Sequence, residues 1–123
     1  MNRESPQVRA SDVVTLTPAQ FAAVQQLGYL LLRHGQYGKA KTLFTALHAL
    51  RPTDLNLTAS LAYARLQLAE FDDVLVLLAH TTRPSGTPPP IFHALRARAL
   101  AGRADHETAR ESMTTFIHEQ RHP

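Results

Sequence analysis

The sequence contains no cysteine and no tryptophan, and only five of its 123 residues are glycine. The lack of cysteine excludes a disulfide-stabilised scaffold, a thiolate metal site and a thiol nucleophile. The glycines are isolated, so no glycine-rich phosphate-binding loop is present. No apolar run approaches the roughly 18 residues that a membrane-spanning helix needs, and the first residues lack the apolar core of a secretory signal. We therefore expect a protein that is not inserted in a membrane.

Charged residues are also scarce, at 19% of the chain, and the formal net charge is only +3. This excess permits an acidic partner. It is too small, with aromatic residues at 7%, to predict a nucleic-acid site. Apolar residues account for 44%, which is enough for the core of one small domain.

Apolar residues spaced three and four apart predict an all-α protein with six helices joined in pairs. The first helix has the signals of a capping box, because Thr17 precedes Pro18 and Gln20. Residues 1–15 show no apolar periodicity, and we predict a flexible N-terminal tail there. The six helices are expected at about 18–33, 37–50, 55–68, 71–79, 91–101 and 105–119, with a turn at Gly102 between the last two.

A shift of 34 residues superimposes the second helical pair on the first. Small residues then align with small residues, and large apolar residues with large apolar residues. The matched pairs are Leu27 with Leu61, Gly28 with Ala62, Tyr29 with Tyr63, Gly35 with Ala69, Tyr37 with Phe71 and Phe44 with Leu78. Thirty-four residues is the period of the tetratricopeptide repeat.

The first pair resembles this family in its motif as well. Gly28, Gly35-x-Tyr37, Ala40, Phe44 and Pro52 stand at the family's spacing. The resemblance implies about three helical hairpins stacked as a short right-handed solenoid. We place one domain at residues 16–121, with repeats at about 21–54, 55–88 and 89–121. Gly28 and Ala40 would allow a close helix crossing, while Tyr37 and Phe44 would fill the space between hairpins.

The resemblance also implies a concave groove lined by the first helix of each hairpin. Side chains on the face opposite the packing residues would then contact a partner, either a helix or an extended peptide. The predicted partner-binding residues are Gln25, Tyr29, Leu32, Arg33, Tyr63, Leu66, Gln67, Phe92 and Arg96.

In length and layout the chain is similar to the small tetratricopeptide chaperones of bacterial type III secretion. The YscY type, which binds the exported protein YscX, and the YscG type, which binds the needle subunit, are both short three-repeat chains. This resemblance implies a cytoplasmic bacterial chaperone that stabilises one small secretion protein before export, as a hetero-oligomer, with a homodimer as the form of the isolated chain. The alternative is a general peptide-binding adaptor or scaffold of the same family.

The last residues spell His118-Glu119-Gln120-Arg121-His122, the H-E-x-x-H pattern of zinc hydrolases. Pro123 follows at once, so the last helical turn should fray, and no third ligand is marked elsewhere. A metal-dependent hydrolase is therefore only a remote alternative. We predict no catalytic residues, no cofactor and no metal site.

Overall fold

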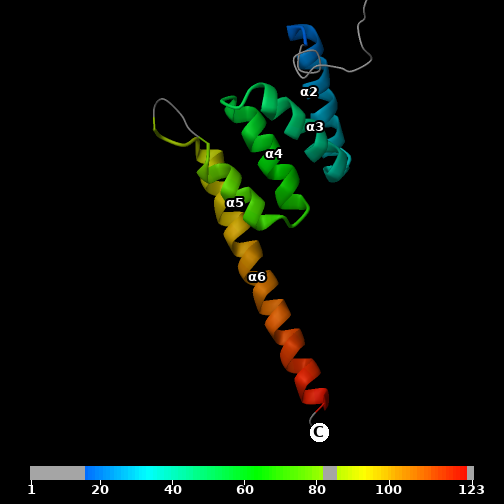
Figure 1. Cartoon of the computed structure of the whole chain (residues 1–123), viewed down its shortest axis with the longest axis vertical. Coiled ribbons are helices and arrows are strands. Elements are labelled where there is room, and N and C mark those ends of the chain that lie inside the picture. The colour runs from blue at the N-terminus through cyan, green and yellow to red at the C-terminus, as the bar shows by residue number, and fades with distance from the viewer. Residues whose placement is uncertain (1–15, 82–85, 122–123) are drawn as a thin grey trace, which may run out of the picture.

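The computed structural model describes residues 16–81 and 86–121, which are helical apart from short turns (Figure 1). The five helices are α2 (Pro18–Arg33), α3 (Tyr37–Leu50), α4 (Leu55–Gln67), α5 (Phe71–Ala79) and α6 (Pro90–Arg121). These ranges contain no strand, and the predicted all-α class is confirmed. None of the five helices is long and apolar enough to cross a bilayer. The predicted N-terminal tail, residues 1–15, lies outside the described residues.

Local side-chain bonds start the first and third of these helices. At α2 the hydroxyl of Thr17 accepts a bond from the Gln20 amide at 3.1 Å, and the Thr17 amide donates to Oε1 of Gln20 at 2.9 Å. The predicted capping box is thus confirmed. At α4 a carboxylate oxygen of Asp54 accepts bonds from the amides of the second and third helical residues.

The two hairpin turns have the same backbone conformation one repeat apart. Gly35, between α2 and α3, has φ +72°, and Ala69, between α4 and α5, has φ +60°. Glycine adopts this left-handed conformation without a steric penalty, whereas alanine does not. The 34-residue alignment of Gly35 with Ala69 therefore identifies equivalent turns.

The number of helices differs from the prediction, because the helices expected at 91–101 and 105–119 are one continuous α6. Gly102 lies inside this helix rather than in a turn. A Cβ at Gly102 would overlap the ring of Phe71, which packs there from the start of α5. Glycine is needed at this point for a close helix crossing, so the predicted turn, and with it the hairpin form of the third repeat, is wrong.

The core consists of two apolar clusters that share α4. The first joins α2, α3 and α4 around the fully buried Phe44, and the second joins α4, α5 and α6 around Val74. Leu77 of α5 packs against both clusters. At Gly28 an added Cβ would lie 2.6 Å from Cζ of Phe44, so the predicted close crossing of α2 and α3 is confirmed.

Equivalent positions in the two repeats are covered to different degrees. Leu61 in α4 is 2% exposed, whereas its counterpart Leu27 in α2 is 48% exposed. α4 packs against α3 on one side and against α5 and α6 on the other, while α2 packs mainly against α3. Within the described residues, α2 is therefore the terminal helix of the stack, and its outer face has no neighbour.

Candidate partner-binding site

Tyr29 lies on α2 with its ring held against the first core cluster. The ring centroid is 5.5 Å from that of Phe44, in a tilted arrangement. The phenolic oxygen accepts a bond from Nε2 of Gln25, one turn earlier on the same helix, at 3.0 Å. Tyr29 is partly buried, so its ring is fixed while part of its surface faces solvent.

Tyr63 lies on α4 and is held by the preceding hairpin. Its ring meets the ring of Tyr37, the first residue of α3, edge to face at a centroid distance of 6.4 Å. It also packs against the second core cluster, which contains Leu95 and Ala99 of α6. Tyr37 thus fills the space between the first hairpin and α4, as the sequence predicts. Both tyrosines are partly exposed and pack against another ring, Tyr29 against the buried Phe44 and Tyr63 against the partly buried Tyr37.

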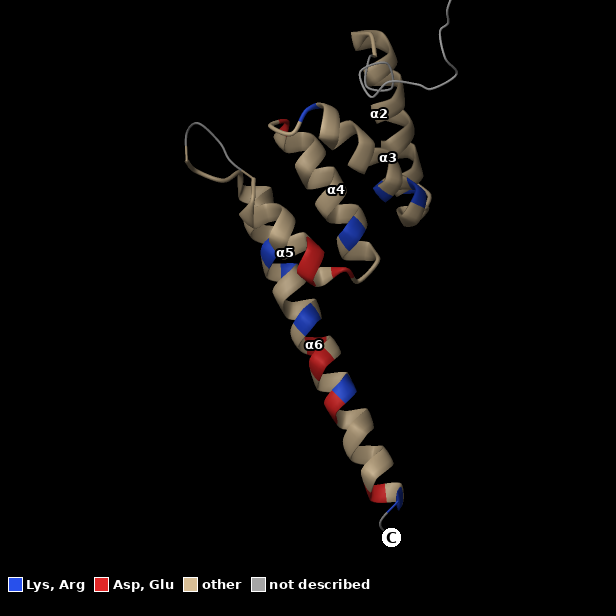
Figure 2. Ribbon diagram, in the orientation of Figure 1, with Lys and Arg blue, Asp and Glu red and all other residues tan. Residues whose placement is uncertain are grey.

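Most of the other predicted residues on α2 and α4 are also accessible. Gln25, Leu32 and Gln67 are partly buried, and Arg33 is exposed at the end of α2. Arg33 is the only charged residue of α2 (Figure 2). These predicted residues on α2 and α4 therefore combine amide, aromatic and apolar groups with one positive charge.

Two of the predicted groove residues are in the core instead. Leu66 packs with Val74 and Leu95 in the second cluster, and Phe92 is 5% exposed. The prediction that Leu66 and Phe92 contact a partner is therefore wrong, because both side chains are buried. The 34-residue alignment identifies equivalent positions, but it does not show that α6 covers the side of α4 on which Leu66 lies.

Arg96 is exposed, but it lies with α5 rather than with the tyrosines. Together with Phe92 and His93 it lines a hollow of ≈ 160 Å³ whose other wall includes Leu78 and Ala79 of α5. Phe92 and Arg96 therefore lie at the junction of α5 and α6, whereas the other predicted residues lie on α2 and α4.

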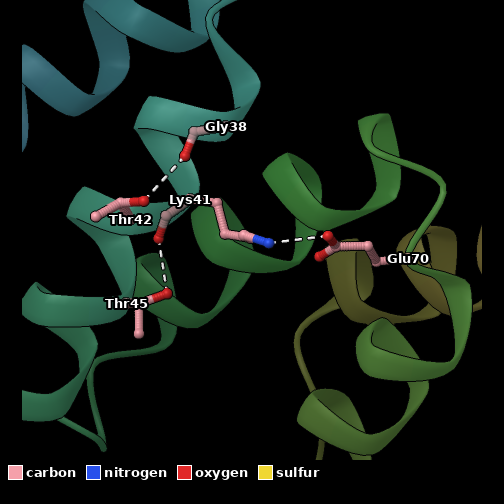
Figure 3. A network of polar contacts seen from close by, with 5 residues as sticks. All are labelled: Gly38, Lys41, Thr42, Thr45 and Glu70. Carbon is pink, nitrogen blue, oxygen red and sulfur yellow. Dashed lines mark hydrogen bonds and ion pairs between the residues drawn. The ribbon is translucent and has the colours of Figure 1, made fainter.

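One ion pair holds the relative position of the two hairpins. Nζ of Lys41, on α3, lies 2.8 Å from Oε2 of Glu70, which precedes α5 (Figure 3). Both side chains are about one-third exposed, so solvent screens the attraction and its contribution to stability is modest. It links the hairpin that carries Tyr29 to the hairpin that carries Tyr63.

Exposed apolar residues lie at both ends of the stack, and the sequence pattern does not predict their exposure. Leu27 and Leu30 are exposed on α2, and Met113, Phe116 and Ile117 are exposed near the end of α6. The helical spacing in both places predicts packing within hairpins. Only the structure shows that no described element covers these faces.

The H-E-x-x-H pattern gains no support from the described residues. His118 and Glu119 are exposed in the last turns of α6, and His122 lies outside the described range. Within residues 16–81 and 86–121, no three histidine or carboxylate side chains converge as a metal site would require.

Comparison with known families matches residues 31–99 to the model described as a tetratricopeptide repeat. The match covers more than half of the chain and runs from the last residues of α2 into the first third of α6. No curated protein and no solved structure matches the chain.

Proposed function

Because the chain belongs to the tetratricopeptide repeat family, we propose that it binds a protein partner on the face of α2 and α4 that carries Tyr29 and Tyr63. Proteins of this family bind other proteins in general and serve as adaptors. In this chain, the proposed binding surface lies on α2 and α4. We call this surface, made by Gln25, Tyr29, Leu32, Arg33, Tyr63 and Gln67, the tyrosine face.

The observation that carries the proposal is that two partly exposed tyrosine rings each pack against another aromatic ring. Tyr29 rests on Phe44 and Tyr63 on Tyr37, so neither ring needs to be ordered when a partner arrives. Tyrosine is enriched among residues that dominate binding energy, because it offers a large rigid surface together with a hydroxyl. Preorganised anchors reduce the entropy lost on association. These properties favour the tyrosine face over the outer face of α2.

In its finer form, we propose that the chain is a chaperone for one small type III secretion protein. The support is its resemblance in length and repeat layout to the YscY-type and YscG-type chaperones. The general adaptor remains the second candidate, favoured by the family match, which is not specific to secretion. The two differ in the partner: a chaperone holds one small protein that is poorly soluble alone, whereas an adaptor binds a short tail of a stable protein.

The proposal is tested by co-purification from the native cell with a tagged chain. The informative variant is Arg33→Glu combined with Gln67→Glu, because these side chains are accessible and contribute little to the core. We expect a partner that co-purifies with the unaltered chain to be lost from this variant. The Tyr29→Ala/Tyr63→Ala variant should show the same loss, although it also removes packing against Phe44 and Tyr37.

The matched control is Leu27→Ala combined with Leu30→Ala, which alters exposed residues on the outer face of α2. Retention of the partner by this control and its loss from the charge variant would support the tyrosine face. Loss from the control alone would place binding on the outer face and contradict the proposal. The size and solubility of the captured partner then distinguish a chaperone from an adaptor.

A further inference from the structure

α6 has one face that repeats with alternating steps of three and four residues along its whole length. In the first half of the helix this face is formed by Phe92, Leu95, Ala99, Gly102 and His106. Each of these positions is buried or packs against α4 or α5: Leu95 and Ala99 belong to the second cluster, and Gly102 and His106 contact Phe71. A repeat of this kind is typical of helices that pair side by side.

The same face continues beyond His106, where no described element covers it. The next positions in the series are Ala109, Met113, Phe116 and Gln120, and Ile117 lies beside them. Met113, Phe116 and Ile117 are 58%, 56% and 46% exposed. Figure 1 shows this half of α6, in orange to red, extending away from the other helices. The pattern that pairs α6 with α4 and α5 is thus present here, but no described helix is paired with it.

We propose that this face is covered by the same face of a second copy of the chain, with the two helices antiparallel. A parallel pair would bring the second α6 into the space beside residues 92–106 that α4 and α5 occupy, so the antiparallel pair is the one that fits. In the antiparallel pair the two hairpin bodies lie at opposite ends. Met113 of one copy is then opposite Phe116 of the other, so the face is complementary to itself.

The charges of residues 107–121, which we call the exposed half of α6, are compatible with this arrangement. Residues 112–118 carry no carboxylate, lysine or arginine, so the apolar centre of the pair meets no buried charge of that kind (Figure 2). The antiparallel orientation also opposes the dipoles of the two helices, which is favourable.

The surface where the exposed half of α6 begins, beside Phe71, also has room for the end of a second helix. Two hollows lie beside Phe71, one of ≈ 360 Å³ reaching along α6 to Ala109 and one of ≈ 330 Å³ reaching to Arg110. Residues 107–121 extend roughly 22 Å beyond the last contact with α5, at about 1.5 Å per helical residue. Complete overlap of two such segments brings the last turn of each copy to the hollows of the other.

The test is the oligomeric state of the full chain, measured by sedimentation velocity from low to high micromolar concentration. Few apolar side chains meet in this interface, so we expect a monomer–dimer equilibrium in the micromolar range rather than a permanent dimer. Met113→Asp and Phe116→Asp should each weaken dimerisation by roughly tenfold or more, because each would bury an unpaired charge. Thr115→Asp, on the other side of the helix, should leave it unchanged.

Because these residues are exposed in the monomer, the variants should keep the far-ultraviolet circular dichroism of the unaltered chain, and this measurement is the folding control. A chain that remains monomeric at high micromolar concentration overturns the proposal and leaves the face to a different protein. A dimer that is equally strong in the Met113→Asp and Phe116→Asp variants overturns it as well.

Orientation is tested separately, because the chain has no cysteine of its own. Mixing the Ala109→Cys and Gln120→Cys variants under oxidation should give mainly the mixed disulfide. Rapid 109–109 linkage would instead indicate a parallel pair and contradict the antiparallel arrangement. These experiments involve no residue of the tyrosine face, so their failure and a failure of the proposed partner site are distinguishable.

Discussion

The helical glycines Gly28 and Gly38 have different surroundings, so substitution by alanine should affect them differently. An added Cβ at Gly28 meets the fully buried ring of Phe44, whereas one at Gly38 meets nothing within 4 Å. Gly28→Ala should therefore destabilise the fold by about 1–2 kcal/mol, since overpacking exceeds the gain in helix propensity. Gly38→Ala should be neutral or stabilising by up to about 1 kcal/mol. Urea unfolding of the two variants measures both values; equal effects would contradict the close crossing.

The turn at Ala69 gives a second prediction at this scale. Ala69 has φ +60°, which is strained for alanine and natural for glycine. Ala69→Gly should raise the free energy of unfolding by about 0.5–1 kcal/mol, because relief of strain exceeds the added flexibility of the unfolded chain. The same substitution at Ala101, exposed inside α6, should lower it by about 1 kcal/mol. Opposite signs are expected in thermal unfolding, and a loss of stability in both would show that Ala69 is unstrained.

At the scale of elements, the first half of α6 packs against α4 and α5, whereas its second half is exposed. Residues 103–121 are all exposed, while Leu95 and Ala99 are buried. An isolated helix of this length is only marginally stable in water. Hydrogen exchange at low protein concentration should therefore be fast for the amides of residues 108–121 and slow for those around residues 95–102. Equal protection along the whole helix under these conditions would indicate a cover that the described residues do not provide.

The bounds of the first four helices follow from signals that act locally. Thr17 and Asp54 are capping residues, Gly35 is a left-handed turn, and each acts on atoms within a few residues of itself. Sequence periodicity and turn chemistry correctly predict the helices at 18–33, 37–50 and 71–79. The helix predicted at 55–68 ends one residue earlier, at Gln67.

The error at Gly102 has a physical reason of another kind. A glycine in a helical pattern can end the helix or admit a neighbour at close range, and the sequence does not distinguish the two uses. The ring that requires Gly102 belongs to Phe71, some thirty residues earlier. Likewise, Leu66 and Phe92 were assigned to an accessible face because the repeat pattern does not state which side the next helix covers.

At the scale of the whole molecule, the stack presents faces with different properties. The tyrosine face has two packed aromatic rings and a single charge. The exposed half of α6 instead has apolar side chains between charged turns (Figure 2). We expect the first to determine which partner binds and the second to determine how many copies of the chain assemble. The two roles can be separated, because the faces lie on different helices and share no residue.

The most direct measurement of the central claim is site-specific photo-crosslinking in the native cell. A photoreactive phenylalanine derivative is placed at Tyr63 in one chain and at Leu27, on the outer face of α2, in another. We expect one protein to be crosslinked through position 63 and not through position 27, because the tyrosine face contacts the partner. Crosslinking of that protein through position 27 alone would contradict the account and assign recognition to the outer face of α2.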